Sequence, residues 1–408
     1  MKFPKLTELD EDQKKVYDGA PVDGTILVMG PPGTGKTVIA FHRARVLKGM
    51  GQAPKVLMYN KVLKRFSSGG SGESLANDIA VKTLHQWVWG WWFGLTGARG
   101  APSLNGEPYQ HDWEAIQGRV IKKIVENGSV GRASWGHLII DEGQDFQEPM
   151  YSALRSIMTI ANAKGATPPL AITVMADENQ RLNERHNATL DQIRQGLGLH
   201  ASQKNVFTLR KNYRNTQEIA RFASHFYVGL QSGQPDLPSR RHGVKPVISI
   251  SGKDTEGKNL NAFVEKIAKY AKAHRTMEVG VLTPKDATRE KLVNRLSKRL
   301  DDEGIIVQTY TSKNKDAPAE DLVFDTPGHV TVLNCASAKG LEFDAVFIVD
   351  PGSLMTGGAA ERSAKMTLYV MCSRARAFLN VMLVRDDSCK TLLSWLPNSK
   401  DSHQVEEL

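Results

Sequence analysis

Residues 30–37 read GPPGTGKT, a pattern that could bind the phosphates of a nucleotide. Gly33 and Gly35 let backbone N–H groups converge on phosphate oxygens, and a helix that begins at the loop favours their negative charge. An apolar run at 26–29 precedes the loop and a helical pattern follows it, which is the context that this motif requires. The residues expected to contact the nucleotide are Gly33, Thr34, Gly35, Lys36 and Thr37.

Within this loop, Lys36 is expected to reach the β- and γ-phosphates, and Thr37 to ligate Mg²⁺. A second motif, DEGQD at 141–145, follows the apolar run at 138–140. Carboxylates at the end of a parallel strand lie where α/β sheets bind ligands. Asp141 is therefore expected in the Mg²⁺ shell, and Glu142 as acceptor of a proton from the attacking water. An acidic turn alone would be an ordinary turn or helix cap, but together with the phosphate loop it predicts hydrolysis of ATP or GTP.

Further short motifs surround these two. In chain order they are Gln13 in LDEDQKKVYD, Tyr59–Lys61, Thr83–His85, Ala176–Gln180, Asn212–Arg214 (NYR), Lys339–Phe343 (KGLEF) and Ser373–Arg376 (SRAR). With GPPGTGKT and DEGQD, this ordered set resembles the superfamily 1 helicases of the UvrD/Rep-like class. The phosphate loop alone indicates only a P-loop NTPase, whereas the resemblance extends over most of the chain.

The resemblance implies roles for individual residues. Around the nucleotide it implies contacts from Gln13 to adenine, Tyr213 to the base, Glu342 to the ribose, and Gln180 and Arg214 to the γ-phosphate. Gly340, in the same motif as Glu342, is also expected to bind the nucleotide. Arg374 resembles an arginine finger that the second domain delivers, so that the cleft must close to complete the site. The implied contacts with a single strand are Asn60, Lys61, Thr83, His85 and Arg185.

The chain departs from the family pattern in places. Ala176 stands where the family has glycine, and residues 181–185 (RLNER) replace aromatic side chains that stack on a base, although an arginine can also stack. Residues 334–336 (NCA) replace a T-x-H pattern. The stretch from 283 to 327 is too short for the large accessory insert of full-size relatives. We therefore expect a motor that lacks the large accessory insert. Robust separation of a duplex could then require a partner.

Rigid elements must position these motifs, and short β-branched runs recur along the chain. The runs expected to form strands are 26–29, 56–59, 138–140, 170–175, 206–209, 247–250, 279–282, 305–307, 330–333, 346–349 and 381–384. Continuous apolar runs with helical patterns between them are typical of parallel strands buried on both faces. The pattern predicts two α/β domains in tandem, and the resemblance implies that they are RecA-like P-loop NTPase domains with the ATP cleft between them.

Gly, Pro and charged residues break the periodicity at 231–245. The expected domains are therefore 1–230, with a short insert at about 94–130, and 231–408. Residues 286–300 predict a helix whose apolar side lies opposite a solvated basic face that includes Arg289. The tail at 398–408 is expected to fray.

Composition restricts the possible function. The 408 residues carry a net charge of +9, which permits a polyanionic partner such as nucleic acid but is also common among soluble proteins. No run approaches the roughly 18–20 apolar residues of a membrane span, and no secretory signal is visible, so a cytoplasmic location without a membrane partner is expected. With no CxxC pair, the cysteines predict neither a disulfide framework nor a zinc site. They are Cys335, Cys372 and Cys389.

An aromatic cluster, HQWVWGWWFG, follows the Thr83–His85 motif. Packing in the core is the favoured interpretation, while docking of a partner protein and stacking on bases remain alternatives. His85 is expected to be a polar contact to the strand rather than a metal ligand.

Two functional hypotheses follow. The first is a DNA helicase or translocase that moves on single-stranded DNA, in the 3′→5′ direction by resemblance, with ATP and Mg²⁺ as cofactors and single-stranded DNA or a tailed duplex as partner. The second is an ATP-dependent, DNA-sensing regulatory subunit of a nuclease complex that unwinds little alone, as in anti-phage defence. No feature of the sequence separates DNA from RNA.

Overall fold

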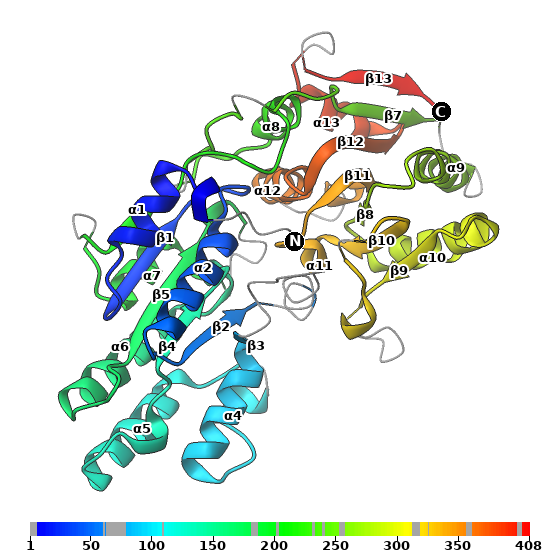
Figure 1. The fold of residues 1–408 in the computed structure, drawn as a ribbon. Coiled ribbons are helices and arrows are strands. Elements are labelled where there is room, and N and C mark those ends of the chain that lie inside the picture. Colours follow the sequence, from blue (N-terminus) through cyan, green and yellow to red (C-terminus); the bar gives the residue numbers. More distant parts are fainter. Residues whose placement is uncertain are drawn as a thin grey trace.

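The fold consists of two parallel β-sheets that follow one another along the chain, each covered by helices (Figure 1). The computed structural model describes residues 6–59, 62, 79–107, 110–180, 187–200, 204–230, 233–238, 241–252, 258–311, 319–324, 326–355, 361–397 and 402–408. In Figure 1 the first domain runs from blue to green and the second from green to red. Two tandem α/β domains with parallel sheets confirm the predicted fold class.

The first sheet has the strand order β3-β2-β4-β5-β1-β6, and every neighbouring pair is parallel. Its strands are β1 (Thr25–Met29), β2 (Pro54–Met58), β3 (Ala80–Thr83), β4 (His137–Ile140), β5 (Ala171–Ala176) and β6 (Val206–Thr208). The helices of this part are α1 (Glu11–Gly19), α2 (Lys36–Gly49), α4 (Leu84–Thr96), α5 (Trp113–Asn127), α6 (Glu148–Ala163), α7 (Leu190–Gly196) and α8 (Gln217–Ser224). Ile26 and Val28 pack with α2 on one face, while Leu27 packs with α4–α7 on the other. Burial on both faces explains why the central strands β1, β4 and β5 are mostly apolar.

The second sheet has the order β13-β7-β12-β11-β8-β10-β9 and is also parallel throughout. Its strands are β7 (Val247–Ser251), β8 (Val279–Thr283), β9 (Ile306–Thr309), β10 (His329–Asn334), β11 (Phe343–Val349), β12 (Ala375–Val384) and β13 (Gln404–Glu407). Its helices are α9 (Lys258–Ala273), α10 (Asp286–Leu300), α11 (Cys335–Ala338), α12 (Glu361–Cys372) and α13 (Asp387–Ser394). Helices α9 and α10 pack with Val281 on one face, and α12 packs with Leu282 on the other.

Each predicted run lies within a strand except for at most one residue at its end, but the structure adds two strands that the sequence analysis missed. Both are edge strands with polar sequences, AVKT in β3 and QVEE in β13, so neither carries a continuous apolar run. The expectation that the tail frays is wrong for residues 404–407, because β13 pairs with β7 in parallel register.

Helix α10 confirms the predicted helix at 286–300, but one residue of its expected basic face is misplaced. Arg289 is buried, and its guanidinium donates to Thr309 Oγ1 at 2.9 Å. The apolar stem of arginine and its several donors allow such burial where acceptors are present.

The aromatic cluster lies on α4 and divides between the core and the surface. Its buried members are Trp87, Trp91 and Trp92, and the rings of Trp87 and Trp91 stack at 5.1 Å. Trp89 and Phe93 are 39% and 55% exposed. Core packing is therefore confirmed for the buried part of the cluster.

Helix α8 comes before the expected boundary at 230/231, yet it packs on α12 and β12 of the second domain (Figure 1). Phe222 contacts His403, and Phe226 contacts Trp395, through their rings. Packing alone would therefore assign α8 to the second sheet, and the boundaries 1–230 and 231–408 stay a prediction.

Two regions bear on the expected inserts. Segment 94–130 contains α5, whose Ile116, Val120 and Ile124 are buried against the first sheet. Between β8 and β10, the described residues form α10, a short 3₁₀ turn at Asp301–Glu303, edge strand β9 and a second turn at Ala319–Asp321. Among the described residues, no helix has the length and apolarity needed to cross a membrane.

Candidate nucleotide site and side pocket

One cleft between the two sheets brings together most of the predicted nucleotide residues. Its lining residues from the first part of the chain are Glu8, Gln13, Gly33, Gly35, Lys36, Thr37, Val38, Glu142, Gln180, Tyr213 and Arg214. Those from the second part are Arg241, Gly340, Glu342, Arg374 and Arg376. The cleft lies at the carboxyl ends of β1, β4 and β5, where ligands bind in parallel sheets.

The phosphate loop has a backbone that only glycine adopts readily. Gly33 and Gly35 have φ angles of +81° and +85°, and Gly35 precedes the first turn of α2. A Cβ atom at Gly35 would lie 2.5 Å from Gln13 Nε2, and one at Gly33 would lie 2.6 Å from Asn212 Oδ1. The loop is thus held tightly from both sides, with the N-terminal N–H groups of α2 directed to the cleft.

Lys36 is buried at the start of α2 and donates to loop carbonyls. Its Nζ lies 2.7 Å from the Gly30 carbonyl, 3.0 Å from the Pro31 carbonyl and 3.7 Å from Asp177 Oδ2. An ammonium group in this position can exchange its carbonyl partners for phosphate oxygens without leaving the loop.

Thr37 and Asp141 form the pair expected to hold Mg²⁺. The Thr37 hydroxyl donates to Asp141 Oδ2 at 2.8 Å. Burial, reinforced by the charge of Glu142, raises the pKa of Asp141 to about 7. No cluster of three or more His, Cys, Asp or Glu side chains suited to a metal occurs among the described residues. The pair nonetheless fits Mg²⁺, because this ion takes oxygen ligands and usually keeps one or two protein ligands beside phosphates and waters.

Glu142 follows β4 in a strained, left-handed backbone conformation, with φ of +53°. Burial by itself raises its pKa, but the ammonium groups of Lys339 and Lys36 outweigh burial and hold the pKa below its ordinary value. Gln144 Nε2 donates to Glu142 Oε2 at 2.6 Å and orients the carboxylate. The Glu142 side chain is therefore a buried carboxylate that is ionised, and a proton acceptor must be ionised.

Gln180 and Arg374 meet across the cleft. Arg374 Nη2 donates to Gln180 Oε1 at 2.7 Å, and Gln180 Nε2 donates to Asp177 Oδ2 at 2.8 Å. Arg374 is 1% exposed, and burial, followed by repulsion from Arg214, lowers its pKa to about 10. The guanidinium remains charged at neutral pH and is directed at the γ-phosphate sensor that the sequence predicts.

Glu342 forms ion pairs with two arginines that also line the cleft. Arg214 Nε donates to Glu342 Oε2 at 2.7 Å, and Arg376 Nε donates to Glu342 Oε1 at 3.0 Å. Although burial opposes ionisation, the charges of Arg214 and Arg376 lower the pKa of Glu342 to about 2. Arg214 and Glu342 lie on different domains, so this ion pair is also an interdomain contact.

Gln13 and Tyr213 also line the cleft, where they contact the first helix and the phosphate loop. Gln13 Nε2 donates to the Thr34 carbonyl at 3.1 Å, and Gln13 Oε1 accepts from the Asp10 N–H at 3.2 Å in a capping box of α1. Tyr213 is 44% exposed and its hydroxyl donates to Asp10. An exposed aromatic ring fixed at its hydroxyl offers a face on which a base can stack.

A second, smaller pocket borders the first domain, and we call it the side pocket. It is lined by Tyr59, Leu84, His85, Gln110, His111, Trp113, Asp145, Phe146, Gln147 and Asn187. His85 Nδ1 and His111 Nε2 share a hydrogen bond of 3.0 Å, and burial lowers the pKa of both rings, to about 4 for His111. Both imidazoles are therefore neutral at pH 7.

Only some of the residues expected to contact a single strand of nucleic acid lie in the described part of the chain. His85 lines the side pocket, whereas Thr83 is buried and its hydroxyl caps α4 by accepting from the Gln86 N–H at 3.4 Å. Asn60, Lys61 and Arg185 lie outside the described residues.

Two family models match the chain. A model described as "AAA domain" matches residues 13–186, and one described as "UvrD-like helicase C-terminal domain" matches residues 329–382. Together they span more than half of the chain and contain every motif quoted above except Asn212–Arg214. These two matches support a UvrD-like superfamily 1 helicase. This is an ATP-hydrolysing, DNA helicase-like family.

Two solved helicase structures are similar to the UvrD-like chain. The C-terminal domain of a possible DNA helicase from Lactobacillus plantarum WCFS1 is 24% identical, with a TM-score of 0.33, and the match covers 47% of this chain and 98% of that one. The DUF1998 helicase MrfA bound to DNA is 11% identical, with a TM-score of 0.49, over 98% of this chain and 53% of that one. The chain thus spans about half the length of MrfA. A search of curated protein sequences gives no match.

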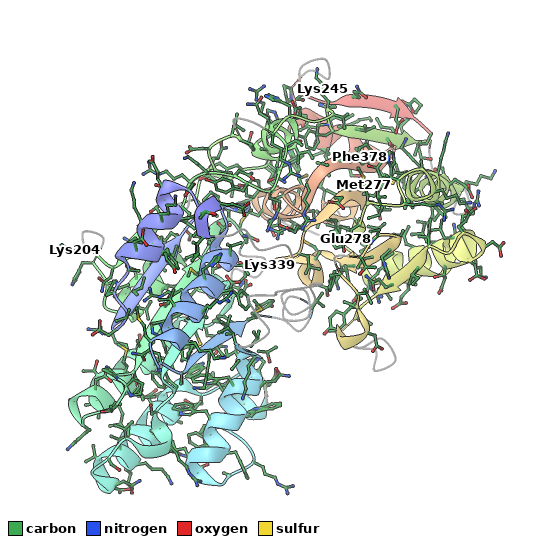
Figure 2. All side chains as sticks on the ribbon, viewed as in Figure 1. Lys204, Lys245, Met277, Glu278, Lys339 and Phe378 are labelled. Carbon is green, nitrogen blue, oxygen red and sulfur yellow. The ribbon has the colours of Figure 1, made fainter. Side chains whose placement is uncertain are left out.

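The UvrD-like site contains residues to which the sequence analysis assigned no role. Lys339, within KGLEF, lies between the two domains (Figure 2) and donates to Asp145 and to the Gln180 carbonyl. Arg376 and Arg241 line the nucleotide cleft. Motif position could have indicated Lys339 and Arg376, but nothing in the sequence marks Arg241, which lies in the segment that joins the domains.

Proposed function

We propose that the chain is an ATP-dependent motor that translocates along single-stranded DNA in the 3′→5′ direction and unwinds duplex weakly on its own. One observation carries this proposal: Arg374 of the second domain donates to Gln180 of the first within the cleft that Lys36 and Glu142 line. A nucleotide site completed by both domains couples the state of the nucleotide to the arrangement of the domains.

In the proposed reaction, Lys36 holds the β- and γ-phosphates while Arg214 and Arg374 neutralise charge that develops on the γ-phosphoryl group. Glu142 accepts a proton from the attacking water. Thr37 and Asp141 would hold Mg²⁺, which would supply Lewis-acid stabilisation of the phosphate oxygens. In this structure Arg214 pairs with Glu342, so a bound γ-phosphate must compete with the Glu342 carboxylate for the Arg214 guanidinium.

The proposed stroke follows from where the polar interdomain contacts lie. Arg214–Glu342 and Arg374–Gln180 both border the nucleotide cleft, and Asn215 Nδ2 donates to the Ala375 carbonyl at 2.6 Å nearby. Binding and release of phosphates would remake the first two contacts in each cycle. The two domains would then shift relative to one another and move a strand that contacts both.

We place the single strand beside the side pocket. Tyr59, Phe146 and Trp113 give it aromatic walls, and Gln110 and Gln147 give it amides, a combination that suits a nucleobase. Asp145 lines this pocket and pairs with Lys339, which also donates to the Gln180 carbonyl. A single strand in the side pocket would therefore be connected with Gln180, the expected γ-phosphate sensor, through the side chains of Asp145 and Lys339.

The alternative is a DNA-sensing regulatory subunit of a nuclease complex. Two observations favour it: the chain between β8 and β10 is short, and Trp89 and Phe93 are exposed one turn apart on α4. Exposed aromatic side chains so close together are suited to contact with another protein.

Steady-state ATP hydrolysis by the purified chain tests the proposal, measured without nucleic acid and with single-stranded DNA, duplex DNA or single-stranded RNA. We expect single-stranded DNA to give the strongest stimulation, followed by directional movement on strands blocked at one end. Hydrolysis that no nucleic acid stimulates would refute an autonomous motor and favour the regulatory subunit. Stronger stimulation by RNA would refute DNA as the track.

A further inference from the structure

The carboxylate of Asp145 has one oxygen without a hydrogen-bond donor. Its Oδ1 accepts from the Lys339 ammonium group and from Asn187 Nδ2, the second at 3.0 Å. Its Oδ2 is buried and accepts from no donor in the part of the chain that the structure describes. Because a buried acceptor without a donor is costly, this oxygen indicates a ligand that supplies one.

The ligand would enter the side pocket, which Asp145 lines. Although the Asp145 side chain is only 2% exposed, it borders the same space as Tyr59 and Phe146, whose rings lie 6.3 Å apart at an angle of 65°. The proposed function, on which this inference rests, places the single strand beside this pocket. An aromatic wall can stack on any base, whereas a carboxylate oxygen accepts only from a base that presents a donor.

The other polar groups of the side pocket leave this acceptor to the ligand. His85 Nδ1 and His111 Nε2 bond to each other at 3.0 Å, and Asn187 already donates to the other oxygen of Asp145. Gln147 is the N-cap residue of α6, but its side chain makes no capping bond. Its amide therefore offers a donor and an acceptor to the remaining edge of a base.

The nucleobases differ in what they offer to such an acceptor. Cytosine, adenine and guanine carry an exocyclic amino group, and aspartate or glutamate can accept from the amino group of cytosine. Thymine and uracil have no amino group, and their one ring N–H lies between two carbonyl oxygens, which a carboxylate repels. We propose that the side pocket selects a nucleobase with an exocyclic amino group, which donates to Asp145 Oδ2.

Two homo-oligonucleotides of equal length, oligo(dC) and oligo(dU), test this selectivity on the wild-type chain. Cytosine has an amino group where uracil has a carbonyl. Fluorescence anisotropy is measured at pH 8.0, above the pKa of about 7 to which burial raises Asp145. We expect a dissociation constant about tenfold lower for oligo(dC), the effect of one hydrogen bond to a charged group. An oligonucleotide of pyrimidin-2-one, which is cytosine without its amino group, should bind as weakly as oligo(dU).

Asp145→Asn changes the group that faces the base and keeps the shape of the side chain. Its amide oxygen can accept from Lys339 and Asn187, so its NH₂ group would replace Oδ2 and donate to the uracil carbonyl. This variant should therefore prefer oligo(dU). Both oligonucleotides are measured on the same protein, so a smaller folded fraction does not change their ratio. Glu148→Gln, an exposed carboxylate that does not line the pocket, should keep the wild-type ratio.

The outcomes separate this inference from the function on which it rests. Equal affinity of the wild type for oligo(dC) and oligo(dU), or tighter binding of oligo(dU), would overturn the selectivity. So would a preference for oligo(dC) that the pyrimidin-2-one oligonucleotide shares or that Asp145→Asn retains. If Asp145→Asn does not fold, the comparison with pyrimidin-2-one decides alone. A wild-type chain that binds none of these oligonucleotides would instead refute the proposed function.

Discussion

Lys339 of the second domain forms a buried ion pair with Asp145 of the first, although the two residues are 194 positions apart. Each side chain is 2% exposed, and the same ammonium group donates to the Gln180 carbonyl. Burial raises the pKa of Asp145 to about 7 even though Lys339 opposes this change. The pair therefore links the two domains at a point between the side pocket and the nucleotide cleft.

Removing Lys339 should be costly, because it leaves the Asp145 carboxylate buried without its ammonium partner. We expect Lys339→Ala to lower the free energy of unfolding by about 3–5 kcal/mol in chemical denaturation. The control is Lys122→Ala, which removes an exposed pair with Glu126 on α5 and should cost less than about 1 kcal/mol. Similar losses in the two variants would contradict a structural role for the buried pair.

The sequence alone located the elements of this fold well wherever strands are buried on both faces. Such strands are near-continuous apolar runs, so they are visible without an alignment. Strands β3 and β13 were missed because edge positions impose no such demand. Arg289 was misplaced for a related reason: its burial depends on Thr309, an acceptor that only the folded sheet brings within reach.

The nucleotide residues could be predicted because the phosphate loop and the residues after β4 share one sheet edge. Contacts between the domains could not be predicted, since they depend on how the two sheets, each formed by its own part of the chain, approach each other. Lys339–Asp145 and Arg374–Gln180 are of this kind, and so is Arg241, whose position follows from the path of the joining segment.

Replacing the phosphate-loop lysine tests the site assignment directly. Lys36→Ala should abolish ATP hydrolysis, because no other ammonium group lies in the loop to hold the β- and γ-phosphates. Lys48→Ala, an exposed position near the end of the same helix, should retain full activity. A Lys36→Ala rate above about a tenth of the wild-type rate would contradict the assignment.

Glu142→Gln removes the proposed proton acceptor with little change in shape. We expect this variant to bind ATP without turning it over, and therefore to bind single-stranded DNA more tightly when ATP is present. Fluorescence anisotropy of a labelled strand measures the difference. Glu148→Gln, an exposed carboxylate at the start of α6, is the matched control. If ATP leaves the affinity of Glu142→Gln for DNA unchanged, nucleotide state and strand binding are not coupled as proposed.

Arg374 is expected to act in turnover rather than in binding. Arg374 also donates to the Val370 and Leu341 carbonyls, so Arg374→Lys is preferable to alanine because it keeps a donor there. The lysine variant should lower kcat by about 10³ or more and leave the dissociation constant for ATP within a few-fold. Arg385→Ala, which removes an exposed ion pair with Glu407, should change neither. Equal losses of binding and turnover would argue for a structural role instead.

His137 should make the fold sensitive to acid. It is fully buried on β4, its Nε2 shares a 2.8 Å hydrogen bond with Thr173, and burial, followed by the charge of Arg43, lowers its pKa to about 3. In the unfolded chain the same ring has an ordinary pKa of about 6.5. As pH falls from 6.5 towards 3, the unfolded state therefore takes up a proton that the folded state does not.

This difference should reduce the free energy of unfolding by up to about 1.4 kcal/mol per pH unit below pH 6.5, an effect that is absent above that pH. Urea denaturation from pH 7.5 to 5.0 measures the slope. His137→Gln keeps a polar partner for Thr173 but cannot be protonated, so its slope should be shallower by close to one proton. If His137→Gln and the wild type lose stability in parallel, the acid sensitivity arises from other groups.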